Sequence, residues 1–396
     1  MTISHKSMVL SQDTLAYGER VAAALLGLDA LYRAESGDED GLVVLDMSGG
    51  ALKPAPYVDY AEARHAWQAL EADAAALPEA DRRMYYQQLA GSSLAFIQWR
   101  TSGLSLADQL RGFLHVPSAP VSEDELAGLR AELGDLLTRM GFAGDLATQC
   151  QAWQESVLVP PDAVATVLQG LFDEAWERTN RILPIPADKS DGMQVATVRG
   201  VAFNARCNYL ERKVELNVDP VLTYPALKHL ALHECYPGHY VQFKLREVWY
   251  HEGRAPADGL LSVVNTASSS PFEGIADNGI FLLDWFDNDD DRVQHILSRY
   301  RSAIGTVAAW KLHALNEADA EVRAWLAAAS LGGGSGWVDN RMRFIAASGR
   351  AVLIWSYWWG QTVNDAYLAV PAARRADYLE FLYGRMHSPQ TVAMFA

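Results

Sequence analysis

Residues 232–242 read LHECYPGHYVQ, and the rest of the chain is organised around them. They place His233, Glu234 and His239 close together inside an apolar segment that runs from residue 225 to residue 248. A zinc hydrolase needs imidazole ligands for the ion and a general base beside it, and these three residues offer both. We therefore interpret the stretch as a metal site. The alternative is that the histidines pack in the core, as a lone histidine on an apolar helix usually does.

The spacing of the two histidines departs from the common zinc-peptidase motif. In H-E-x-x-H the histidines lie four residues apart and share one helix face. His233 and His239 lie six residues apart, which on an unbroken helix would separate them by about 120°. Pro237 cannot donate a helical hydrogen bond, and its ring clashes with the carbonyl of His233, while Gly238 adds backbone freedom. We predict a break in the helix that brings His239 beside His233. His229, one turn earlier, lies outside the motif.

The pattern resembles the HExxPGHH motif of a bacterial family called domain of unknown function 885, a mostly helical group related to the gluzincin metallopeptidases. Residues 272–276, FEGIA, are similar to the E-G-W-A motif of that family, and Tyr357 with Gly360 is similar to its Y-x-x-G motif. The resemblance covers the chain from about residue 201 onward. Two positions depart from it: Tyr240 stands where the family commonly has a second histidine, and Ile275 replaces a tryptophan.

This resemblance implies one Zn²⁺ per chain, held by His233, His239 and Glu273, with Glu234 as the general base. Asp277 lies four residues after Glu273, on the same face of a helix predicted to run from residue 273 to about residue 286. Such a carboxylate can accept the second ring N–H of a ligating histidine. Two other interpretations stay open: Glu273 as an early-helix acid that complements the helix dipole, and Asp277 as an acid without a role at the metal.

Three residues of the last third are further candidates. The resemblance places Tyr357 in a repeated motif, and a phenol near a metal can donate to a developing oxyanion. Its alternative role is that of a pocket wall, like the tryptophans around it. Arg341 and Arg343 are candidates to bind a substrate carboxylate, because the guanidinium group suits bidentate recognition. They are equally well explained as surface charges on a helix.

The N-terminal half has the periodicity of packed helices. Apolar residues recur at intervals of three and four, which predicts amphipathic helices, in residues 15–32, 58–77, 80–99 and 123–140.

Residues 197–218 change to a partial alternation with β-branched residues, which predicts one or two short strands. In gluzincin-like enzymes a sheet of this kind lies beside the metal helix, so Asn204, Arg206 and Tyr209 become candidate substrate contacts. The alternative is that they are ordinary polar residues on a half-exposed strand.

Composition limits the classes of function. The 396 residues carry 49 acidic and 33 basic side chains, a net charge of −16, so nucleic acids and anionic membrane surfaces are poor partners. The three cysteines are far apart in the sequence and odd in number, as expected of reduced thiols in the cytoplasm. The first residues lack the basic start and apolar core of a signal peptide. We expect a cytoplasmic protein.

We predict a mainly α-helical, metallopeptidase-like fold with a small β-sheet beside the metal-binding helix, divided into a helical lobe (residues 1–196) and a catalytic lobe (residues 197–396). The expected function is zinc-dependent hydrolysis of an amide or peptide bond in a short peptide or amidated metabolite. Two alternatives are a site that binds another divalent metal, such as iron, for a non-hydrolytic reaction, and a catalytically silent metal-binding protein. Glu234 argues against the second, because a structural site has no use for a free carboxylate beside it.

Overall fold

The computed structural model describes residues 9–37, 41–186, 192–201, 203–332 and 334–395. In these residues the protein is mainly helical with small sheets, which confirms the predicted fold class. Residues 1–8, part of the segment in which no signal peptide is predicted, lie outside the described residues. None of the helices in the described ranges combines the length and the apolar composition that crossing a bilayer requires.

The first half of the chain is a succession of helices. Those predicted from the apolar periodicity are all present, with ends that differ by a few residues. At α5, for example, Ser122 and Glu125 form a reciprocal capping box that fixes the first turn. The helices are α1 (Gln12–Ser36), α2 (Tyr60–Ala74), α3 (Ala80–Ser102), α4 (Leu106–Gln109) with the π-helical turn η2 (Leu110–Leu114), α5 (Glu123–Arg139), α6 (Leu146–Ser156) and α7 (Val164–Ile182).

The second half contains shorter helices and more breaks. The helix predicted for residues 273–286 is in fact two helices, because Asn278 interrupts it and its side-chain amide donates to the carbonyls of Gly274 and Gly360. The elements are α8 (Tyr224–Glu234), α9 (His239–His251), η4 (Ala257–Leu260), α10 (Ser269–Asp277), α11 (Gly279–Leu282), α12 (Asp289–His313), α13 (Asp319–Ala329), α14 (Gly334–Ala346), α15 (Ser348–Ala351), α16 (Ile354–Trp359), α17 (Gln361–Ala369), η5 (Ala372–Arg374), α18 (Arg375–Tyr383) and η6 (Thr391–Ala393).

Two small sheets accompany the helices. The larger has the order β2–β4–β3, with β2 (Gln194–Val198) parallel and β3 (Ala205–Asn208) antiparallel to β4 (Lys213–Asn217). It lies beside α8, as predicted, with β3 in contact with that helix. The smaller sheet pairs β1 (Val43–Asp46) with β5 (Leu261–Val263), so it joins the N-terminal half to the segment that follows α9.

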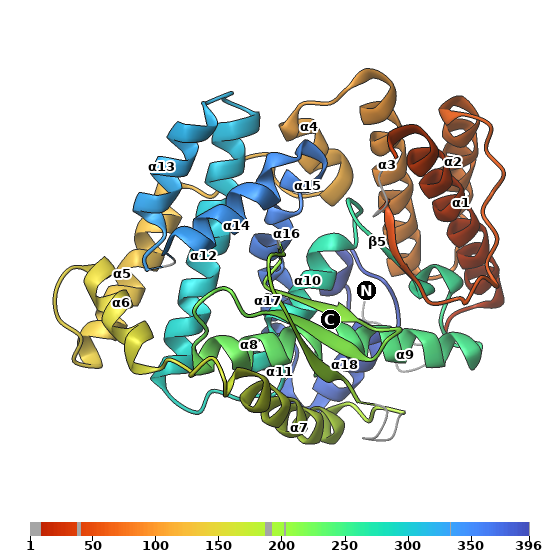
Figure 1. Ribbon diagram of the computed structural model, residues 1–396. Coiled ribbons are helices and arrows are strands. Elements are labelled where there is room, and N and C mark those ends of the chain that lie inside the picture. Colours follow the sequence, from red (N-terminus) through yellow and green to blue (C-terminus); the bar gives the residue numbers. More distant parts are fainter. Residues whose placement is uncertain (1–8, 38–40, 187–191, 202, 333, 396) are drawn as a thin grey trace.

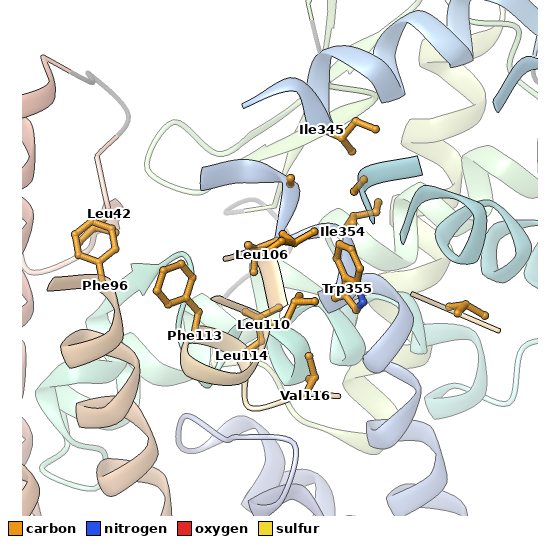
Figure 2. Packing of buried hydrophobic residues seen from close by; sticks show 14 of the residues in the cluster. Leu42, Phe96, Leu106, Leu110, Phe113, Leu114, Val116, Ile345, Ile354 and Trp355 are labelled. Atoms are coloured by element: carbon orange, nitrogen blue, oxygen red, sulfur yellow. The ribbon is translucent and has the colours of Figure 1, made fainter. Parts of the chain in front are cut away.

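Buried apolar side chains form two clusters, and both draw residues from either side of the predicted boundary at residue 196. One cluster joins α1–α6 to α12–α16, and the other joins α7–α11 to α17 and α18. Figure 2 shows part of the first, where Leu110 and Leu114 lie close to Ile354 and Trp355. The indole N–H of Trp355 also donates to the carbonyl of Ala119 at 2.8 Å. This anchoring fixes α16 in the molecular interior.

The centre of the molecule is occupied by α8, α10 and α16, with the larger sheet beside them and α1–α3 at one side (Figure 1). Helices α10 and α16 approach unusually closely at Gly274 and Gly360. A Cβ on Gly274 would lie 2.4 Å from the carbonyl oxygen of Gly360, so a side chain at either position would push the helices apart. Gly274 and Gly360 therefore allow the helix that carries Glu273, α10, to contact the helix that carries Tyr357, α16.

Candidate metal centre

The helix is interrupted between α8 and α9. Helix α8 ends at Glu234 and α9 begins at His239, with a cis peptide bond between Tyr236 and Pro237. The amide of Gly238 donates to the carbonyl of Leu232 at 2.9 Å. A Cβ on Gly238 would lie 1.8 Å from the carbonyl oxygen of His233. The helix break is therefore as predicted, but the glycine is required by this close approach of the backbone more than by its freedom to rotate.

The interruption brings the two histidines of the motif together. Their ring centroids lie 4.6 Å apart, and each side chain belongs to a residue that is only 8% exposed. Tyr240 stands where the resembled family commonly has a second histidine. Its ring packs against the rings of Tyr209 and Tyr236. In this chain His239, and not position 240, lies beside His233.

Helix α10 completes a three-residue group. Oε2 of Glu273 lies 3.4 Å from Nε2 of His233 and 3.7 Å from Nε2 of His239. Zinc bonds of about 2.0–2.1 Å at a tetrahedral angle place two ligand atoms about 3.3–3.4 Å apart. Oε2 is buried and has no hydrogen-bond partner among the described residues, a costly state for an oxygen atom unless something else satisfies it. The three atoms thus fit a shared zinc-sized cation.

Asp277 orients His233 within this group. Nδ1 of His233 donates to Oδ1 of Asp277 at 2.8 Å, which leaves Nε2 facing Glu273. A carboxylate that receives the second ring N–H fixes the tautomer of a ligating histidine and raises its basicity. Burial opposes ionisation of Asp277, but His233 and His229 hold the pKa of this carboxyl well below its usual range.

A second group of potential ligands overlaps the first. Nε2 of His229 lies 3.5 Å from Oδ1 of Asp277, so His229, His233 and Asp277 are also close enough to hold an ion. We favour the group that contains Glu273. Oδ1 of Asp277 already accepts a hydrogen bond from His233, whereas Oε2 of Glu273 accepts none.

His239 is held by two residues that the sequence did not indicate. The ring of Phe272 is stacked on the imidazole, with centroids 4.4 Å apart and planes at 11°. The side-chain amide of Gln242 lies 3.3 Å from Nδ1 of His239 and donates to the carbonyl of Phe272 at 3.1 Å. In the sequence, Gln242 lies one helical turn after His239, and Phe272 immediately precedes Glu273. These positions next to candidate ligands could have indicated a supporting role.

Negative charge accumulates around His233. Burial lowers the pKa of its imidazole, but Asp277, Glu234 and Glu273 together raise it to about 10. The carboxylates at the site thus outnumber the cations that the protein supplies, and a divalent cation would balance them. Since ligating histidines must lose that proton, metal binding is expected to weaken as the pH falls.

Glu234 is the last residue of α8 and is 5% exposed. Within the described part of the chain, no residue donates a hydrogen bond to its carboxylate, which is therefore free to accept a proton from water. The neighbouring thiol of Cys235 is fully buried, and burial raises its pKa well above the ordinary value. Cys235 is thus a packed thiol and not a reactive one.

Tyr357 reaches the same region from α16. Its half-buried ring lies 6.4 Å from that of Phe344. Burial raises the pKa of the phenol well above its ordinary value, and the charges of Glu273 and Asp277 raise it further. The phenol therefore stays protonated and can donate a hydrogen bond.

The other predicted contacts lie elsewhere. Tyr209 is 1% exposed and donates to Glu247 at 2.6 Å, so its hydroxyl is used inside the core and is not available to a substrate. Arg206 is exposed and pairs with Glu215, and Asn204 is exposed at the start of the same strand. Arg343 lies on the exposed face of α14, where it donates to Asn340. The structure does not bring these residues together with the metal group.

Replacing Asp277 with asparagine should weaken zinc binding by about 10–100-fold, because the amide no longer fixes the tautomer of His233 as a carboxylate does. Competition with a zinc-chelating dye measures the affinity. Asp289→Asn, at an exposed position in the first turn of α12, is the control and should bind zinc as the wild type does. An unchanged affinity in Asp277→Asn would show that the carboxylate has no role at the metal.

Comparisons with known proteins bear on the fold alone. No family model matches the chain, and no curated protein matches it. Two solved structures of proteins named "putative lipoprotein" are similar. The one from Colwellia psychrerythraea is 16% identical, with a TM-score of 0.54 over 76% of this chain and 53% of that chain. The one from Shewanella oneidensis, of unknown function, is 11% identical, with a TM-score of 0.53 over 84% of this chain and 72% of that chain. This chain thus spans about half the length of the first.

Proposed function

We propose that this chain is a zinc-dependent, gluzincin-like hydrolase that cleaves an amide or peptide bond in a short peptide or amidated metabolite. The observation that carries the proposal is the buried Oε2 of Glu273, which has no hydrogen-bond partner in the described part of the chain and faces Nε2 of both His233 and His239. The resemblance of the surrounding motifs to domain of unknown function 885 supports the same ligand set. We also propose a cytoplasmic location, which stays a prediction.

The chemistry follows from the groups around the three ligands. When bound, zinc lowers the pKa of a coordinated water molecule and polarises a carbonyl group. Glu234, next to His233 and free of hydrogen bonds from the described residues, would act as the general base that takes a proton from the attacking water and passes it to the leaving amine. Tyr357 donates from the side of α16 to the carbonyl oxygen as negative charge develops on it. Asp277 and Phe272 hold the two imidazoles in position.

Two measurements on the purified protein test the proposal. Elemental analysis should find close to one zinc ion per chain, and a screen of short peptides and acylated amino acids should identify a cleaved amide. Iron in place of zinc, without hydrolysis of any member of the screen, would favour the non-hydrolytic alternative. Bound zinc without any turnover would favour the catalytically silent protein, although such a site would leave Glu234 without a purpose.

Replacing Tyr357 with phenylalanine should lower kcat by about 10²-fold and leave KM nearly unchanged. The hydroxyl is expected to act mainly in the transition state, where a lost oxyanion donor has this effect. Steady-state kinetics with a thermal melt measures both rate and folding. Tyr224→Phe, an exposed tyrosine at the start of α8, is the control. A folded Tyr357→Phe protein with wild-type kcat would remove Tyr357 from the mechanism.

A further inference from the structure

Arg341 on α14 is a half-buried cation without a matching anion. Its guanidinium group lies 5.3 Å from the ring centroid of Trp337 and 5.9 Å from that of Phe344. Nε is buried and has no hydrogen-bond partner in the ranges that the structure describes. No carboxylate in the described ranges lies within ion-pair distance of it. A buried donor that is left unpaired costs free energy, so the position calls for an acceptor from outside the chain.

A second arginine strengthens the positive charge at this place. Arg301 on α12 lies over the same ring of Trp337, at 5.5 Å, and its Nε is also buried, with no partner among the residues described. Arg301 has one hydrogen bond that Arg341 lacks. The side-chain amide of Gln154 can be oriented so that its nitrogen donates to the carbonyl of Gly332, and its oxygen then accepts from Nη2 of Arg301 at 3.3 Å. Burial and, to a lesser extent, the charge of Arg341 lower the pKa of Arg301 to about 10.

Buried cations near the site differ in their partners. Arg246 lies over the ring of Phe272 at 5.5 Å and donates to Gln242, and its buried Nε also has no hydrogen-bond partner among the described residues. Lys228, which is 1% exposed, pairs with Asp287 at 2.9 Å and with Asp291 at 2.7 Å. In a chain with 49 acidic residues and a net charge of −16, carboxylates are plentiful. What distinguishes Arg341 and Arg301 is that two guanidinium groups lie over one indole with no described carboxylate in ion-pair distance, an arrangement suited to an anion.

Tyr357 connects the arginine pair to the metal group. Its ring contacts Phe344, which lies against Arg341. Burial and the charges of Glu273 and Asp277 raise the pKa of the Tyr357 phenol, whereas the charge of Arg341 lowers it. A molecule that contacts Arg341 and extends past Tyr357 would thus reach the zinc ligands.

We propose that Arg341, assisted by the charge of Arg301, binds a carboxylate of the substrate. This inference rests on the proposed hydrolase function and specifies its substrate class: N-acyl amino acids and short peptides that carry a free carboxylate, in preference to their amides. The planar guanidinium fork matches the two oxygens of a carboxylate, and the metal group then acts on an amide bond elsewhere in the same molecule.

The test measures binding separately from chemistry. The zinc-loaded Glu234→Gln protein is titrated calorimetrically with a set of N-acetyl dipeptides, each prepared as the free acid and as the C-terminal amide. The acids should bind at least about 10-fold more tightly than the amides, as expected for a hydrogen-bonded charge. Adding Arg341→Gln should remove this difference, and Arg341→Lys should restore part of it. Adding Arg323→Gln instead should preserve it, because Arg323 is exposed and pairs with Asp319 and Asp339.

Every outcome decides one of the two proposals. Equal binding of acids and amides, or no binding of either, overturns the carboxylate site, and so does cleavage of both forms by the wild type at equal rates. Arg341-dependent binding of the acids without any cleavage by the wild type supports the carboxylate site and contradicts the hydrolase. The comparison of acid with amide on a protein that retains Arg341 does not depend on whether Arg341→Gln folds.

Discussion

Replacing Glu234 with glutamine should leave close to one zinc ion per chain and lower turnover by at least ~10²-fold, the range expected when a general base is lost. Glutamine has nearly the size and shape of glutamate but cannot accept a proton from water at neutral pH. Glu234 directly follows His233, which we propose as a ligand, and no described residue donates a hydrogen bond to it. Its loss should therefore disturb the chemistry far more than the fold. Elemental analysis and steady-state kinetics on the same preparation provide the two readings.

The control is Glu252→Gln, at an exposed position just after α9, which should bind zinc and turn over substrate as the wild type does. Wild-type rates in a zinc-loaded Glu234→Gln protein would show that another group takes the proton. Loss of zinc from this variant would instead mean that Glu234 contributes to holding the ion.

Replacing His233, His239 or Glu273 with alanine should each remove most of the bound zinc. Loss of one of three protein ligands should weaken binding by more than the ~10–100-fold that follows loss of a residue supporting a ligand. Zinc titration of the metal-free proteins measures the affinities, and circular dichroism checks that each variant is folded. The Glu273→Ala variant is the most informative, because this residue lies far from the histidine motif in the sequence.

His229→Ala is the matched control, since His229 lies one turn from His233 and shares the carboxylate of Asp277. It should retain zinc. The opposite pattern, zinc lost in His229→Ala and kept in Glu273→Ala, would place the ion in the group of His229, His233 and Asp277.

Local sequence patterns predicted the helices well and the sheets less well. The apolar periodicity of residues 123–140 corresponds to α5 at Glu123–Arg139, because a helix is specified by neighbours three and four residues apart. The pairing of β1 with β5 joins residues 43–46 to residues 261–263, and nothing in either short segment indicates the other. In the same way, the helix predicted from Glu273 onward is interrupted at Asn278, whose side chain donates a hydrogen bond to the carbonyl of Gly360. Only the folded chain brings these two residues together.

The residues of the candidate site also fall into two groups: those that local sequence patterns indicate and those that only the folded chain brings together. The compact motif pointed to His233, Glu234 and His239, and its resemblance to a family added Glu273 and Tyr357.

The supporting contacts depend on tertiary packing. The stacking of Phe272 on His239, the position of Gln242 and the meeting of Arg301 with Arg341 on one indole could not be predicted from spacing. Burial of a polar residue could not be predicted either. Tyr209 was a candidate substrate contact, but its side chain is buried and its hydroxyl donates to Glu247 on α9.

Anomalous scattering at the zinc absorption edge, recorded from crystals of the protein purified without added chelator, tests the central claim most directly. We predict one strong peak per chain, bonded to Nε2 of His233, Nε2 of His239 and Oε2 of Glu273. A peak between His229, His233 and Asp277, or no peak near any of these residues in protein that retains its metal, would contradict the proposed centre.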